Sequence, residues 1–174
     1  SVYSVDGRTI EEVVGALLRA VGAHIALAES CTGGLATSRL TDVEGSSDYV
    51  DRAAVTYSNE AKVAMLGVPA ALIDAHGAVS EPVAEAMAEG IRARAAVTVG
   101  VGITGIAGPG GGTPEKPVGT VAIAVAGLGP TRVRTFRFVG GRDLVKFQAA
   151  TAALNMVRLG LLEAGTPTRG AGND

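Results

Sequence analysis

The sequence is poor in residue types on which several large classes of protein depend. It has one cysteine, Cys31, and no tryptophan among its 174 residues. A single cysteine excludes an internal disulfide and suits a reducing compartment. The formal net charge of -2 supplies no basic excess, and lysine and arginine are scattered along the chain. We therefore expect no nucleic-acid partner.

Long apolar runs are also missing. Glycine, threonine or charged residues interrupt each apolar stretch well before the ~20 residues that a membrane span requires. The chain starts at Ser1 without a charged and then apolar leader. We expect a cytoplasmic protein that has no contact with a membrane.

The composition that is present is typical of one globular domain. The chain is 47% hydrophobic, and its length allows a substantial core. We predict a single domain over residues 1–164. Residues 165–174 show no apolar periodicity and predict a disordered tail.

Helical and strand-like segments alternate along this domain. Apolar periodicity and capping signals predict helices over residues 10–21, 32–40, 59–66, 69–75, 81–94 and 142–161. Apolar or β-branched runs predict strands over residues 24–28, 53–56, 97–103, 118–126 and 131–139, the second of them short and buried. The last two strands are separated by a turn and predict a C-terminal hairpin. Together these elements predict an α/β fold of three layers, α/β/α, with a mixed, mostly parallel sheet.

The first junction between a strand and a helix carries the candidate nucleophile. An apolar run ending at Ala28 passes through Ser30 and Thr32 into Gly33 and Gly34. The first turn of a helix presents unpaired N–H groups and the positive end of the helix dipole, which favours an anion there. Ser30 is suited to attack a substrate bound at that point. The alternative is that Ser30 or Thr32 only caps the helix.

Two further junctions of the same kind follow, at Tyr57 and at Thr104. Ligands of open α/β sheets bind at the carboxyl ends of strands, where Ser30, Tyr57 and Thr104 are all expected. Lys62 follows Tyr57 by five residues and is one of three lysines in the chain. A desolvated lysine can lose its proton near neutral pH and act as a base, and Tyr57 could relay a proton or hold the lysine in place. The alternative for Lys62 is an exposed helix residue without a catalytic role, and the alternative for Tyr57 is a half-buried residue at the end of a strand.

A glycine-rich loop follows Thr104, and a helix start follows at Arg142. The loop over residues 105–112 matches neither the dinucleotide fingerprint nor the P-loop, so it is either a cradle for a ligand anion or a tight exposed loop. Arg142 is either a phosphate or carboxylate contact or a solvated helix start.

Several ordered blocks resemble the C-terminal domain of the CinA family over roughly residues 8 to 164. The blocks are Ala28-Glu29-Ser30-Cys31-Thr32-Gly33-Gly34, Thr56-Tyr57-Ser58-Asn59 with Lys62, Gly77-Ala78-Val79-Ser80, Thr104-Gly105-Ile106-Ala107-Gly108-Pro109 with Gly111-Gly112-Thr113, and Lys116-Pro117-Val118-Gly119-Thr120. Such domains, also found alone as PncC, are nicotinamide-nucleotide amidohydrolases. The resemblance implies hydrolysis of nicotinamide mononucleotide to nicotinic acid mononucleotide and ammonia, in pyridine nucleotide recycling. It also implies that Ser30 is the nucleophile, assisted by Tyr57 and Lys62, and that the chain forms a homo-oligomer, with a dimer favoured.

The resulting hypothesis is a serine amidohydrolase. Lys62, with help from Tyr57, would deprotonate Ser30 for attack on the carboxamide. The backbone around Thr32, Gly33 and Gly34 would stabilise the oxyanion, while Thr104, Gly105 and Arg142 would bind the nucleotide. No metal or other cofactor is expected, because no cluster of side chains has ligand spacing. The alternative function is a non-catalytic module, either nucleotide-binding or associated with competence or damage, that binds the mononucleotide without consuming it.

Overall fold

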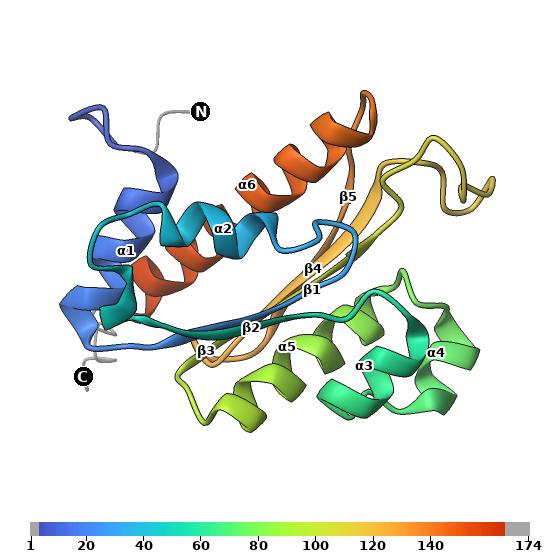
Figure 1. Cartoon of the computed structure of the whole chain (residues 1–174), viewed down its shortest axis with the longest axis horizontal. Helices are drawn as coiled ribbons and strands as arrows, with labels where there is room; N and C mark the ends of the chain where they lie inside the picture. The colour runs from blue at the N-terminus through green and yellow to red at the C-terminus, as the bar shows by residue number, and fades with distance from the viewer. Residues whose placement is uncertain (1–3, 166–174) are drawn as a thin grey trace, which may run out of the picture.

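A mixed five-stranded sheet forms the middle of the protein in a computed structural model that describes residues 4–165 (Figure 1). The strand order is β2-β1-β3-β4-β5. The strands are β1 (Ile25–Glu29), β2 (Val50–Val55), β3 (Val99–Gly105), β4 (Thr120–Ala126) and β5 (Arg132–Arg137). β1 pairs in parallel with both β2 and β3, whereas β4 is antiparallel to β3 and to β5. All strands but β4 therefore point the same way, which confirms a mixed, mostly parallel sheet.

Helices cover both faces of the sheet, as a three-layer α/β/α fold requires (Figure 1). One face carries α1 (Ile10–Val21), α2 (Leu35–Thr41) and α6 (Arg142–Ala164). The other face carries α3 (Asn59–Leu66), α4 (Ala70–His76) and α5 (Glu81–Ala95). A short 3-10 helix, η1 (Ser46–Asp48), precedes β2. The predicted layering is confirmed.

The core is built on strands whose two faces are both covered. Every residue of β1 and β4 is buried, because helices pack above and below them. On the face of β3 that contacts α5, two residues are glycines, Gly100 and Gly102. A Cβ at Gly100 or Gly102 would lie 2.2 or 2.3 Å from a backbone oxygen of α5, at Ala88 or Ala84. Because these two glycines have no side chain, α5 packs directly against the backbone of β3.

Helix ends lie close to where local signals predict them. Thr9 and Glu12 form the capping box that opens α1, and Gly22 closes it in the left-handed conformation. The helix expected over residues 32–40 begins at Leu35, because residues 30–34 form a turn.

The edge strand β2 differs from its sequence-based expectation. The strand expected at residues 53–56 as short and buried is wrong in that respect, since β2 covers Val50–Val55 and is mostly exposed. The reason is that β2 lies at the sheet edge, where it has one neighbouring strand and little helix cover.

The predicted C-terminal tail lies outside the described residues apart from Gly165. Within residues 4–165, none of the helices combines the length and apolar character needed to span a bilayer.

Candidate active site

The three predicted strand-to-helix junctions meet at one edge of the sheet. Ser30 directly follows β1, Tyr57 follows the end of β2 by two residues, and Thr104 is the penultimate residue of β3. They share a pocket of about 170 Å³. Its lining residues are Ser30, Cys31, Tyr57, Asn59, Lys62, Ala78, Val79, Thr104, Gly105, Ala107 and Arg142. The parallel strands bring these residues together, because their carboxyl ends share one edge.

Lys62 and Ser30 form the central contact of this pocket. The Nζ atom of Lys62 donates a hydrogen bond to Oγ of Ser30 at 3.2 Å, although the residues are 32 positions apart in the chain. Nζ also donates to the backbone oxygens of Thr56, at 2.9 Å, and Tyr57, at 3.3 Å. Ser30 is 7% exposed and Lys62 is 1% exposed, so the pair is largely removed from bulk water.

The position of Lys62 follows from how α3 begins. Ser58 caps α3 by accepting a hydrogen bond from the N–H of Ala61 at 3.0 Å. Lys62 lies in the first turn of this short helix and is one of its two buried residues. The cap therefore directs the lysine side chain toward the sheet edge and Ser30.

Burial changes the acidity of the Lys62 amine. It lowers the pKa of Lys62 below its ordinary value of 10.5, because an ammonium loses hydration when it leaves water. Among residues 4–165, no carboxylate forms an ion pair with it that would restore the charged form. A neutral amine keeps two N–H groups for the carbonyls of Thr56 and Tyr57. In that neutral form the contact with Ser30 would reverse its direction, with Nζ accepting from the hydroxyl as a general base must.

Tyr57 is bonded differently from the sequence-based expectation. Its backbone oxygen, and not its phenol, holds the lysine. The side chain is 59% exposed, and its hydroxyl accepts a hydrogen bond of 2.9 Å from Arg142. Arg142 also donates to the backbone oxygen of Gly108, at 2.7 Å. The Tyr57 phenol and Arg142 thus form one rim of the pocket, next to the glycine-rich loop.

The N-terminus of α2 already has an anion. We expected a ligand there, but the carboxylate of Glu29 accepts the N–H groups of Ala36 and Thr37, each at 3.0 Å. The Thr32 hydroxyl also donates to Glu29, at 2.6 Å, and is therefore turned away from a ligand. A side chain of the protein therefore takes the N–H groups of Ala36 and Thr37 and compensates the positive end of the α2 dipole.

Gly33 and Gly34 complete the turn after Ser30 and do not line the pocket. The N–H of Gly33 donates to the backbone oxygen of Ser30 at 3.0 Å, and both glycines have positive φ angles. A positive φ is favourable for glycine and costly for other residues, so the pair permits a tight turn. The two glycines therefore shape the segment that carries Ser30.

Thr104 and Gly105 form a wall of the pocket at the end of β3. The Thr104 hydroxyl donates to the backbone oxygen of Ala78 at 2.8 Å, which holds the segment before α5 against the sheet. A Cβ at Gly105 would lie 2.7 Å from a methyl group of Val121 and 3.0 Å from the Sγ atom of Cys31. This wall has no room for a larger residue.

Sequence reasoning missed several lining residues, of which Cys31 and Asn59 carry functional groups. Burial raises the pKa of the Cys31 thiol to about 12, so it stays protonated and is a poor nucleophile. Asn59 directly follows the cap of α3 and lines the pocket. Its place in the block Thr56-Tyr57-Ser58-Asn59, two residues after Tyr57, was a signal that could have identified it.

Comparison with known proteins identifies the family of the chain. The family model described as CinA C-terminal domain matches residues 7–161. The chain belongs to the CinA family. CinA-like proteins of Anaeromyxobacter dehalogenans (strain 2CP-C) and Mycobacterium tuberculosis (strain ATCC 25177 / H37Ra) are 57% and 54% identical to it. The alignments cover 87% and 90% of this chain but only 37% and 36% of those relatives.

Solved structures of the CinA superfamily match over nearly their whole length. A competence/damage inducible protein, CihA from Agrobacterium tumefaciens, is 38% identical, with a TM-score of 0.83 and coverage of 95% of this chain and 99% of that one. A superfamily protein from Klebsiella pneumoniae is 33% identical, with a TM-score of 0.85 and coverage of 90% and 99%. The α/β fold of this CinA domain is therefore that of the superfamily.

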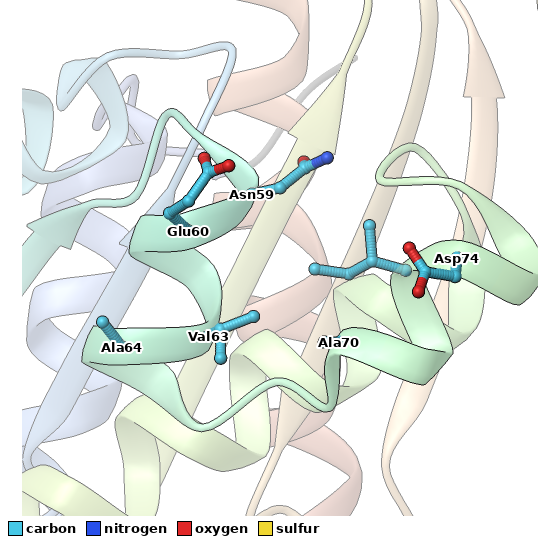
Figure 2. Close-up of a pocket in the computed structure, with 7 residues that line it drawn as sticks. Asn59, Glu60, Val63, Ala64, Ala70 and Asp74 are labelled. Carbon is cyan, nitrogen blue, oxygen red and sulfur yellow. The ribbon is translucent and has the colours of Figure 1, made fainter.

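A second pocket of the CinA domain lies between α3 and α4 (Figure 2). It measures about 400 Å³ and is lined by residues of α3 and α4, among them Asn59, Glu60, Val63 and Asp74. Asn59 lines both pockets. The α3–α4 pocket contains no nucleophile next to a base, so we assign the chemistry to the smaller pocket. Over residues 4–165, no group of three His, Cys, Asp or Glu side chains could hold a metal ion.

Proposed function

We propose that this CinA-family domain hydrolyses the carboxamide of nicotinamide mononucleotide to nicotinic acid mononucleotide and ammonia. The single observation that carries the proposal is the buried contact of 3.2 Å between Nζ of Lys62 and Oγ of Ser30. Pairs of serine and lysine are one of the recurring solutions to acyl transfer. The family resemblance supplies the substrate, and the contact supplies a nucleophile with its base.

The reaction would proceed through an acyl-enzyme. Neutral Lys62 takes the proton of Ser30 while Oγ attacks the carboxamide carbon, giving a tetrahedral intermediate. Lys62 then returns that proton to the leaving nitrogen, which departs as ammonia as the C–N bond breaks. Water, deprotonated by Lys62, attacks the ester carbon, and Ser30 recovers its proton as the acid is released.

The size and charge of the pocket support a nucleotide whose ring end alone is enclosed. A pocket of about 170 Å³ is smaller than the range of about 300 to 1,000 Å³ that is usual for whole small-molecule sites. The pyridine carboxamide would enter it, and the ribose phosphate would extend over the rim. Arg142 lies at that rim, and no carboxylate within residues 4–165 forms an ion pair with it. Its guanidinium is suited to a phosphate.

The test is incubation of the chain with nicotinamide mononucleotide, followed by mass spectrometry of the nucleotide and an ammonia assay. We expect conversion of amide to acid by the wild type and by Ser38→Ala, a control at an exposed serine of α2. Ser30→Ala should bind the nucleotide in calorimetry and release no ammonia. Turnover by Ser30→Ala would refute the mechanism. Binding by the wild type without consumption would favour a non-catalytic module, the reading closest to the competence-damage name of the Symbiobacterium thermophilum relative.

A further inference from the structure

Glu29 is a buried carboxylate that the proposed reaction does not use. It is the last residue of β1, directly before Ser30, and its exposed fraction is 0%. Within residues 4–165, no lysine, arginine or histidine forms an ion pair with it. Burial of a carboxylate is strongly unfavourable unless hydrogen bonds compensate it. The buried Glu29 carboxylate lies next to the proposed nucleophile, and the hydrogen bonds of Glu29 indicate its role.

Four donors surround the Glu29 carboxylate. Oε1 accepts from the hydroxyl of Thr32, at 2.6 Å, and from the N–H of Ala36, at 3.0 Å. Oε2 accepts from both the N–H and the hydroxyl of Thr37, at 3.0 and 2.6 Å. Two of these donors are backbone groups of the first turn of α2, which has no side-chain cap of its own at Gly34. Glu29 therefore caps α2 from the preceding strand.

Hydrogen bonds of Glu29 fix the turn that carries Ser30 at both of its ends. Before the turn, the backbone of Glu29 is held by the chain that follows β2, since the N–H of Thr56 donates to its oxygen at 2.8 Å. After the turn, its side chain holds Thr32 and the start of α2. Ser30 itself donates its N–H to the backbone oxygen of Ile103 of β3 at 2.9 Å. The same peptide segment is thus linked to the end of β2, to β3 and to α2.

The geometry points to Glu29 as a positioning residue: its carboxylate anchors residues 32–37 to the end of β1 and so keeps Oγ of Ser30 within reach of Nζ of Lys62. This inference rests on the proposed function, because it concerns the same Ser30 and Lys62. Glu29 does not line the substrate pocket. It acts on the reaction only through the turn between Glu29 and Leu35.

Substitution of Glu29 by Gln isolates the role of the carboxylate. Gln has nearly the same size but one acceptor oxygen, and its NH2 group would face two donors that Glu29 now satisfies. The charge that compensates the α2 dipole is also lost. We expect kcat for nicotinamide mononucleotide to fall by about 100-fold, the loss that a misplacement of about 1 Å can cause, with KM nearly unchanged.

A second readout does not depend on the substrate. A serine-reactive fluorophosphonate should label Ser30 of the wild type, and intact-mass spectrometry gives the rate, with Ser30→Ala as the blank. Glu29→Gln should label more slowly by a factor similar to its loss of kcat. If the wild type labels but does not consume the mononucleotide, the proposed function fails while the labelling rates still test Glu29.

Two controls separate positioning from stability. Glu11→Gln removes another carboxylate that binds α2, through the ion pair with Arg39, and should leave kcat and labelling at wild-type values once corrected for the folded fraction. Thr37→Val removes one of the hydroxyl groups that donate to Glu29 and should lower kcat and the labelling rate by at least about threefold. Thr37→Ser keeps that hydroxyl and should lower neither. These two variants test the inference if Glu29→Gln does not fold. Wild-type kcat and labelling in folded Glu29→Gln, or in Thr37→Val, would overturn the inference.

Discussion

Removal of the buried Lys62 amine should change both the activity and the stability of the protein. Lys62→Met keeps the length and most of the volume of the side chain but removes the nitrogen. That nitrogen belongs to a residue that is 1% exposed, and it contacts Ser30 and two carbonyl oxygens. Without a base, the rate of amide hydrolysis should fall by about 10²- to 10⁴-fold.

The stability effect depends on pH in a defined direction. The unfolded chain binds a proton at Lys62 with the ordinary pKa of 10.5, whereas the folded protein has a lower pKa because burial disfavours the ammonium. Between those two values the unfolded state holds more protons, so folding becomes more favourable as pH rises. The thioether of the Lys62→Met variant does not titrate. The unfolding free energy of the wild type should therefore gain about 1.4 kcal/mol per pH unit over that of Lys62→Met within this window.

The assay is urea unfolding followed by circular dichroism, from neutral pH up to 10.5, on the wild type and Lys62→Met. Lys116→Met is the matched control, because the Lys116 amine also donates to a backbone oxygen, that of His76 at 2.7 Å, but lies in a partly exposed loop. Activity of the wild type should rise with pH, with a midpoint below 10.5. Parallel stability curves for the wild type and Lys62→Met throughout this range would refute the desolvated base.

Replacement of tyrosine by phenylalanine tests the activity at Tyr57 and the stability at Tyr49. Tyr57→Phe removes a hydroxyl that accepts a bond from Arg142, so ammonia release should fall by less than about tenfold; a loss as large as that of Lys62→Met would instead place the phenol in proton transfer. Tyr49→Phe removes a buried hydroxyl that has no partner among the described residues, so thermal unfolding should show a gain of about 1 kcal/mol, and a loss of stability would mean that the hydroxyl is satisfied by water.

The edge on which the site lies was accessible from the sequence. Each of the three junctions combines an apolar run with small polar residues, and parallel strands place such junctions together whatever the details of packing. Helix ends were equally accessible, because caps such as Thr9 and Ser58 and terminators such as Gly22 act on adjacent backbone groups. These are local or topological signals, which a single sequence carries in full.

Only the tertiary structure decided which polar groups are free for chemistry. Lys62 is suited to act as a base because burial removes its hydration and two carbonyls orient it toward Ser30, and both effects depend on how α3 packs against the sheet edge. The helix end next to Ser30 looks open to a ligand in the sequence, yet Glu29 occupies it in the fold. Hydrogen-bond partners and desolvation are set by the packed arrangement, so residue type and spacing do not determine them.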